Sequence, residues 1–138
     1  MLYKRQKKID LYCIFHNIQN TIMPIEKTIF IPKVNEEVHF VIGKNAKENF
    51  EIIDHSKPND LWFHIENAPS CHVIAKINDS WDRKQIASIV KQGALLCKIN
   101  SKFSSMQNVR VIYTKIQHVE KTKTIGSVVV TNEKNTIV

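Results

Sequence analysis

The sequence has little glycine and proline and no long apolar run. Three glycines and four prolines among 138 residues are too few for a low-complexity or linker-rich chain. No apolar stretch reaches the ~18 residues that a membrane span needs, so we expect no membrane insertion. The three cysteines are widely spaced and form no CxxC pair. They indicate neither a disulfide framework nor a zinc knuckle, and buried free thiols are the simpler interpretation.

Basic residues outnumber acidic ones. The 20 Lys and Arg against 13 Asp and Glu give a formal net charge of +7. This balance favours a polyanionic partner, such as nucleic acid, a ribosome or an anionic membrane. We interpret residues 1–25 as a basic N-terminal arm or a loosely attached first element. This segment lacks the clean apolar region and small-residue exit of a signal peptide, so we expect a cytoplasmic protein.

Strand and helix patterns alternate along the rest of the chain. Residues 26–34 and 36–44 have strand patterns, and Pro32 places the first of these at a sheet edge. Shorter strand patterns follow at 60–65, 71–77 and 109–116, and 126–138 is typical of a terminal hairpin turning through Asn132 to Asn135. One main helix is expected at about 80–98, with Asp79 or Ser80 as its N-cap, and one short helix at about 46–53. The predicted fold class is α+β, a mostly antiparallel sheet with helix cover.

The stretch from residue 60 to 77 gathers polar residues on one face of a predicted hairpin. Leu61, Phe63 and Ile65 alternate with Asp60, Trp62 and His64, and His72 joins the second set from the next strand. One interpretation is a platform on which bases stack on the ring of Trp62. The alternative is that Trp62 packs under the second helix, at about 80–98, and both His satisfy backbone groups. Asp60 is expected to orient one of the two His.

Five blocks, in this order, resemble the NFACT-R domain: GKNAKEN, DLWFH, PSCHV, VRVIYT and HVEKTKTIGSVVVTNEKNTIV. This domain is the C-terminal domain of the tRNA-recruiting factors of ribosome quality control. It also occurs alone in small coiled-coil-domain-type relatives. The resemblance covers most of the chain and implies a single domain at 26–138. It implies nucleic-acid binding, in particular of RNA such as tRNA or rRNA, with no catalysis and no cofactor. Cys71 before His72 and the segment KTKTI before Gly126 depart from the family pattern.

The resemblance also implies a set of site residues. Nucleic acid would be contacted by Lys44, Asn45, Asn49, Trp62, His64, His72, Lys115, Lys121 and Lys123. The site would be ordered by Gly43, Asp60, Pro69 and Ser70. We expect the late lysines to follow the phosphates, beside the Trp62 face.

Several alternatives remain open from the sequence. DNA is one, because phosphates do not distinguish it from RNA. A second is a protein-interaction module on a ribosome-associated complex. A metal-dependent hydrolase built on Asp60, His64 and His72 is disfavoured, because no HExxH or cysteine pair supports a metal site. A dyad of Cys71 and His72 is disfavoured because neighbours on a strand point to opposite faces.

Overall fold

The structure is a computed structural model that describes residues 24–138. The elements are β1 (Ile25–Ile31), β2 (Glu36–Gly43), α3 (Ala46–Asp54), β3 (Leu61–Ile65), β4 (His72–Ala75), α4 (Arg83–Ile99), β5 (Arg110–Lys115), the 3₁₀ turn η2 (Ile116–His118), β6 (Val119–Lys121), β7 (Val128–Val130) and β8 (Lys134–Ile137). Six strands form one sheet in the order β1-β2-β4-β3-β5-β8, and β6 and β7 form a separate ribbon. Every pairing in the main sheet is antiparallel, so the α+β prediction is confirmed.

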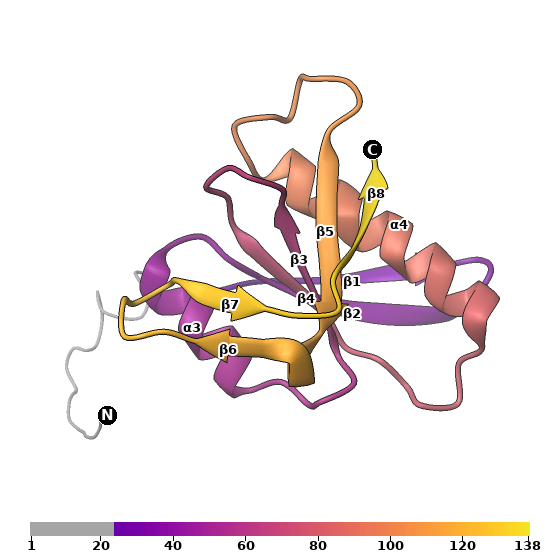
Figure 1. The fold of residues 1–138 in the computed structure, drawn as a ribbon. Coiled ribbons are helices and arrows are strands. Elements are labelled where there is room, and N and C mark those ends of the chain that lie inside the picture. Colours follow the sequence, from indigo (N-terminus) through magenta and orange to yellow (C-terminus); the bar gives the residue numbers. More distant parts are fainter. Residues whose placement is uncertain (1–23) are drawn as a thin grey trace, which may run out of the picture.

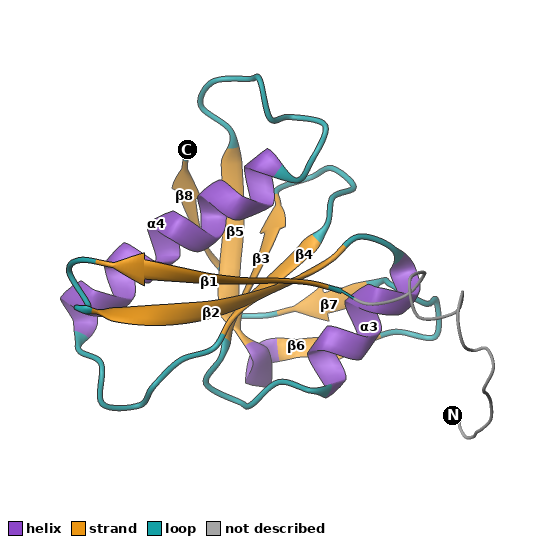
Figure 2. Cartoon of the chain, turned by 180° about the vertical axis from the view of Figure 1, so that it is seen from behind, coloured by secondary structure: helices purple, strands orange, loops and turns teal. Residues whose placement is uncertain are grey.

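Both faces of the main sheet are covered. Helix α4 runs behind β5 in Figure 1 and in front of it in Figure 2, where the molecule is seen from the opposite side. It packs on the face that carries Phe63, whereas α3 and the β6–β7 ribbon close a second core around Trp62 on the other face. The alternation predicted for residues 60–65 is therefore confirmed, because Trp62 and Phe63 lie in different cores.

Several boundaries agree with the sequence patterns. The predicted hairpin at 60–77 is the antiparallel pair β3–β4. Strand β2 ends at Gly43, and β1 lies at the sheet edge and ends at Ile31, directly before Pro32. Residues 1–23 of the predicted N-terminal arm lie outside the described residues, and its boundary at residue 25 stays a prediction. No helix in the described part of the chain has the length and apolar character to cross a membrane.

The N-cap predicted for the main helix was wrong. Helix α4 begins at Arg83, and its cap is Asp82, whose carboxylate accepts from the backbone N–H of Gln85 at 2.9 Å. In turn, the side-chain oxygen of Gln85 accepts from the backbone N–H of Asp82 at 2.8 Å, which completes a capping box. Ser80 donates instead to the side chain of Asn78, so the residues before Asp82 form a turn.

The prediction of a terminal hairpin at residues 126–138 was also wrong. Strand β7 pairs with β6 and β8 pairs with β5, so the two C-terminal strands belong to different sheets. The chain changes sheet at Asn132, which has a φ of 54°. The Thr114 hydroxyl donates to the carbonyl of Thr131 at 2.9 Å and fixes this crossing to β5.

Replacing Gly93 with Ala should destabilise the fold. A Cβ at Gly93 would lie 2.4 Å from the ring of Phe63, so α4 approaches the sheet closely only because this side chain is missing. We expect Gly93→Ala to lower the free energy of unfolding by about 1–3 kcal/mol, measured by urea denaturation. Gln92→Ala, one position along the same helix, is the control and should change it by less than about 0.5 kcal/mol. An equal effect of the two substitutions would contradict the close approach.

Candidate nucleic-acid interface

The aromatic cluster predicted as a platform is buried. Trp62 and His72 are each 2% exposed, and the half-buried His64 lies between them and solvent. The Trp62 ring packs with Ile52, Ile53 and other apolar side chains of the second core. A base therefore has no access to the indole face. Direct base contacts by Trp62 and His72 were a wrong prediction. The alternative was right that both residues are structural, but Trp62 packs against α3 and the β6–β7 ribbon and not under the main helix, and the His72 ring bonds to the indole of Trp62 and not to a backbone group.

Burial keeps the histidine rings of this cluster neutral, and hydrogen bonds hold the rings in place. The indole Nε1–H of Trp62 donates to Nδ1 of His72 at 3.0 Å. Nδ1 of His64 donates to the carbonyl of Ile65 at 2.6 Å, and the His64 ring stacks on Trp62 with centroids 5.5 Å apart. Burial, together with the nearby His64, lowers the pKa of His72 to about 3. Burial also lowers the pKa of His64, against the opposing effect of the Ile65 carbonyl. The cluster thus joins elements of the fold and carries no charge at neutral pH.

Asp60 orients loops and not histidines. Its buried carboxylate accepts from the backbone N–H groups of Lys57 and Ile77, each at 2.9 Å. The ammonium of Lys76 lies 3.7 Å from the same group. The expected contact of Asp60 with a His was therefore wrong. Without Asp60 the hydrolase alternative loses its ligand set, and residues 24–138 contain no group of three His, Cys, Asp or Glu able to hold a metal ion.

The block around Gly43 builds the turn from β2 into α3. Asn45 is the N-cap and accepts from the N–H of Glu48 at 2.9 Å, while Glu48 accepts from the N–H of Lys44 at 3.0 Å. Asn49 is buried and accepts from the N–H of His72 at 3.3 Å. A Cβ at Gly43 would lie 2.5 Å from this Asn49 side chain. Base contact by Asn49 was therefore a wrong prediction, whereas Lys44 is exposed and its role stays a prediction.

The loop between β3 and β4 is held by Ser70. Its hydroxyl accepts from the N–H of Ile65 at 3.1 Å and donates to the carbonyl of Cys71 at 2.9 Å. Pro69 in the same loop is exposed. Cys71 and Cys97 are buried free thiols in the core under α4, on the opposite face from His72. The structure thus agrees with the expected separation of Cys71 from His72, whereas the role of Ser70 in ordering a binding site stays a prediction. Cys13 lies outside the described residues.

The late lysines do not form one track. Lys121 pairs with Asp54 of α3 and lies over the ring of Phe50, with its ammonium 5.2 Å from the ring centroid. Lys123 is exposed in the loop of the β6–β7 ribbon. Lys115 lies on the other face of the sheet, beside the N-terminal end of α4. The expected gathering of these lysines around Trp62 was wrong, because the sheet separates Lys115 from the other two.

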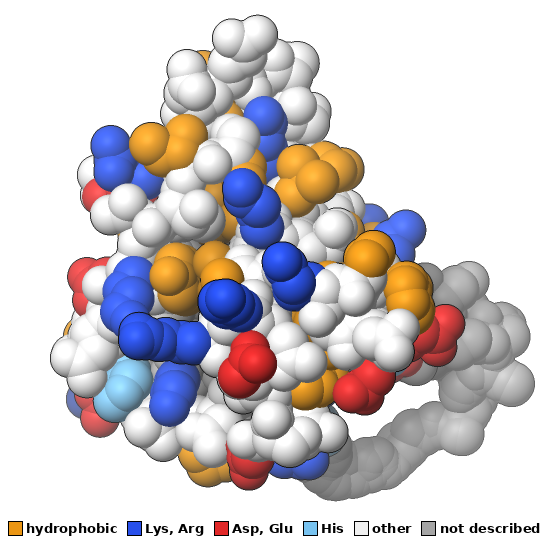
Figure 3. All heavy atoms as spheres, turned by 90° about the vertical axis from the view of Figure 1, so that its right-hand side faces the viewer, with side chains coloured by type: hydrophobic (Ala, Val, Ile, Leu, Met, Phe, Trp, Pro, Cys, Tyr) orange, Lys and Arg blue, Asp and Glu red, His pale blue; other side chains and the backbone are white. Residues whose placement is uncertain are grey.

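Lys115 instead belongs to a basic groove between α4 and strands β5 and β8. This hollow has a volume of about 480 Å³, and its apolar floor includes Leu61, Ile86 and Val90. Its polar lining comprises Arg83, Tyr113, Thr114, Lys115, His118, Asn132 and Lys134, with no acidic side chain. Figure 3, which views the molecule from the right-hand side of Figure 1, shows Lys and Arg side chains gathered on that side, with apolar side chains between them.

The cations of the basic groove are available to a ligand. Arg83, Lys115 and Lys134 are exposed, and among residues 24–138 none of the three forms an ion pair. Tyr113 stacks on Phe63 with centroids 6.0 Å apart, which holds its ring at the groove wall. Arg83, Tyr113 and His118 were not predicted as site residues. Tyr113 and Lys115 are two residues apart on β5 and so share a face, but only the path of α4 brings Arg83 to them.

Acid should destabilise the fold through His72. Below its ordinary pKa of 6.5, an unfolded His72 takes up a proton, whereas the folded one stays neutral down to about pH 3. The unfolded state therefore binds more protons in this window, and stability falls by up to about 1.4 kcal/mol per pH unit. Urea unfolding of the wild type and of His72→Gln, at pH values from neutral down to about 4, measures this slope. Gln keeps an acceptor for Trp62 but does not titrate, so the variant should lose less stability on acidification. Equal slopes would contradict the assignment.

Comparison with known proteins identifies the family. Residues 28–132 match the model of the NFACT protein RNA binding domain. The chain is similar to Coiled-coil domain-containing protein 25 of Bos taurus, with 32% identity over 92 residues, which cover 64% of this chain and 44% of that protein. It is also similar to Rqc2 homolog RqcH of Bacillus subtilis, with 27% identity over 82 residues, 59% of this chain and 14% of the relative.

A solved structure shares the fold. The C-terminal part of the fibronectin/fibrinogen-binding protein of Streptococcus suis aligns with a TM-score of 0.65 and 24% identity, over 73% of this chain and 41% of the other. The alignment with the bovine relative spans less than half of that protein's length. The family model covers most of the chain, and the predicted resemblance is therefore confirmed: the chain belongs to the NFACT protein RNA binding domain family.

Proposed function

We propose that the chain binds RNA in the basic groove. The observation that carries this proposal is a set of three exposed cations, Arg83, Lys115 and Lys134, that form no ion pair within residues 24–138 and surround a hollow without acidic lining. Such cations bind the phosphates of a nucleic acid, and each neutralised phosphate releases condensed counterions, which favours binding. The ring of Tyr113 and the imidazole of His118 lie in the same hollow and offer contacts to a ribose or a base. Membership of an RNA-binding family supports RNA over DNA as the ligand.

The proposed binding is non-catalytic and weakly sequence-specific. The matched family is one of RNA-binding domains and not of enzymes. Phosphate contacts position a protein on nucleic acid without reading its sequence, so the groove distinguishes bases less strongly than it attracts charge. The similarity to RqcH supports a role linked to ribosome quality control. We include tRNA or rRNA as the ligand and a cytoplasmic location in the same proposal. The activities of the longer relatives come to this chain only as part of this proposal.

Charge reversal in the basic groove should weaken RNA binding. The double variant Lys115→Glu with Lys134→Glu removes two phosphate contacts and adds repulsion, so we expect at least about tenfold weaker binding at low salt. The slope of log Kd against log salt should also become shallower, by about 0.7 for each lost contact to a single strand. Filter binding or fluorescence anisotropy with tRNA, across a salt series, measures both quantities.

The matched control is Lys33→Glu with Lys91→Glu. These lysines line another shallow hollow, on the far side of α4 beside β1, and their reversal changes the net charge by the same amount. We expect the control to weaken binding only slightly, through the long-range field. If both double variants weaken binding equally, net charge and not the groove attracts RNA. If the wild type binds no RNA at low salt, the proposed function is wrong and a protein partner becomes the better candidate.

A further inference from the structure

The basic groove continues into two further hollows around the start of α4. A small hollow of about 200 Å³ shares Leu61, Ile86 and Lys115 with the basic groove. Its other lining residues, which include Asn59, Asp79 and Trp81, also line a larger hollow of about 640 Å³. The three hollows therefore adjoin one another, and we call them together the extended groove; its lining runs from strands β5 and β8 to Glu37 and His39 of β2. No sequence pattern indicated this continuation.

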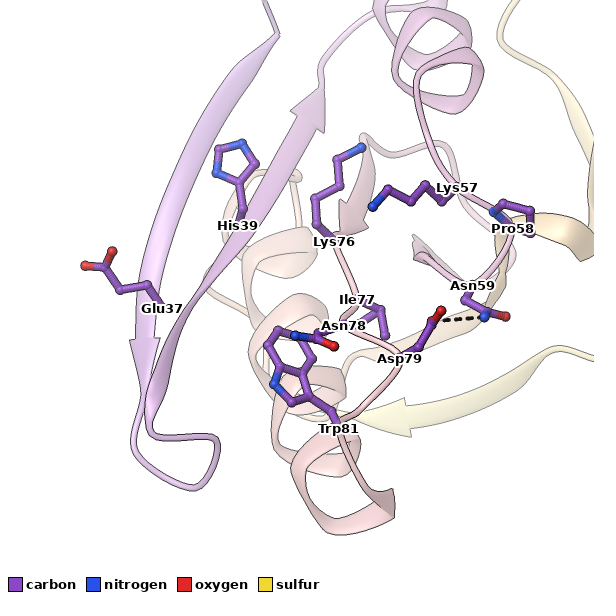
Figure 4. A pocket seen from close by; sticks show the side chains of 10 residues that line it. All are labelled: Glu37, His39, Lys57, Pro58, Asn59, Lys76, Ile77, Asn78, Asp79 and Trp81. Atoms are coloured by element: carbon purple, nitrogen blue, oxygen red, sulfur yellow. Dashed lines mark hydrogen bonds between the residues drawn. The ribbon is translucent and has the colours of Figure 1, made fainter.

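Figure 4 shows the larger hollow. Lys57 extends toward it from the turn before β3, and Trp81 forms part of the wall on the other side. The indole of Trp81 is half-buried against the core under α4, and its Nε1–H donates to the carboxylate of Glu36 at 3.1 Å. This bond and the core contact hold the ring in one orientation. Trp81 therefore supplies the accessible indole that the buried Trp62 does not.

The two ends of the extended groove differ in charge. Among residues 24–138, the three cations of the basic groove form no ion pair, and the groove lining has no carboxylate. The Trp81 end is mixed in charge: it has the cation of Lys57, the carboxylates of Glu37 and Asp79, and the amides of Asn59 and Asn78. The cation of Lys76 at this end is paired with Asp60. Carboxylates repel phosphate but accept hydrogen bonds from the amino groups of bases. The Trp81 end thus suits a base and the other end suits the backbone.

We propose that the extended groove binds a single-stranded segment of RNA, with a base stacked on Trp81 and the adjoining backbone on Arg83, Lys115 and Lys134. A duplex keeps its bases stacked inside the helix and offers no free base face to an indole, whereas single strands stack splayed bases on aromatic side chains. This inference rests on the proposed function, because it uses the same cations for the phosphates. It adds the form of the RNA and the residue that receives its base.

The test compares a short unstructured RNA of A and U with the same strand annealed to its complement. We expect the wild type to prefer the single strand, and Trp81→Ala to weaken single-strand binding by about 5- to 100-fold. Duplex binding should change by less than about twofold, because it uses the cations alone. Phe103→Ala is the control: Phe103 is another half-buried aromatic packed on the same core, in the loop after α4 and outside the groove lining.

Tryptophan fluorescence gives a readout that does not depend on the stability of the Ala variant. The chain has two tryptophans, and Trp62 is buried. The single strand should quench the wild-type emission, and it should leave Trp81→Phe, which keeps an aromatic ring against the core, nearly unquenched. Thermal unfolding followed by circular dichroism verifies that each variant is folded.

The outcomes separate this inference from the proposed function. Equal affinity for single strand and duplex, or an unchanged affinity in folded Trp81→Ala, overturns the single-strand inference. The proposed function can stand when the single-strand inference fails. It does so if the double variant Lys115→Glu with Lys134→Glu binds RNA more weakly than the wild type does. If the wild type binds neither RNA, both are wrong.

Discussion

The burial of both faces of strand β3 decides where a ligand reaches this protein. Phe63 is fully buried under α4, and Trp62, the adjacent residue, is 2% exposed under α3 and the β6–β7 ribbon. Burying each of these rings contributes roughly 2–3 kcal/mol to folding, so neither face opens without a large loss of stability. The hollows of the extended groove accordingly lie beside the sheet and not on either buried face of β3. The extended groove lies where the turn before β3, the loop before α4 and the end of β5 meet.

The polar residues in the second core form a connected set. The N–H of His72 bonds to Asn49 of α3, its Nδ1 accepts from Trp62 of β3, and His72 itself belongs to β4. An unsatisfied buried polar group costs about 1–3 kcal/mol, so these partners must remain together. The side chains that resemble a binding motif thus fix α3 against the central strands. Their specific types follow from this packing without any contact to a ligand.

Period-two alternation predicted which residues share a face, but not whether that face is covered. Trp62, His64 and His72 were correctly placed together, yet the ribbon that covers them comes from residues 119–130, far along the chain. The same non-local pairing explains the missed crossing at Asn132, because the pattern of β7 and β8 is that of a local hairpin. The cap of α4 was predictable: Gln85, three residues after Asp82, is the capping-box signal. The basic groove was not, since Arg83 and Lys115 meet only through the path of α4.

The charge difference along the extended groove has a consequence for how it recognises a ligand. Counterion release gives affinity without sequence preference, and the cations that produce it line the basic groove. Hydrogen bonds to base edges discriminate between bases, and the carboxylates and amides that can form them lie at the Trp81 end. Stacking accepts every base, because each has a π-face. An RNA strand bound in the extended groove would therefore be bound through its phosphates in the basic groove. At the Trp81 end its bases would be distinguished only weakly. Added salt should therefore weaken the binding of the RNA backbone in the basic groove without changing the base preference at the Trp81 end. The phosphate contacts and the base contacts are made by different residues.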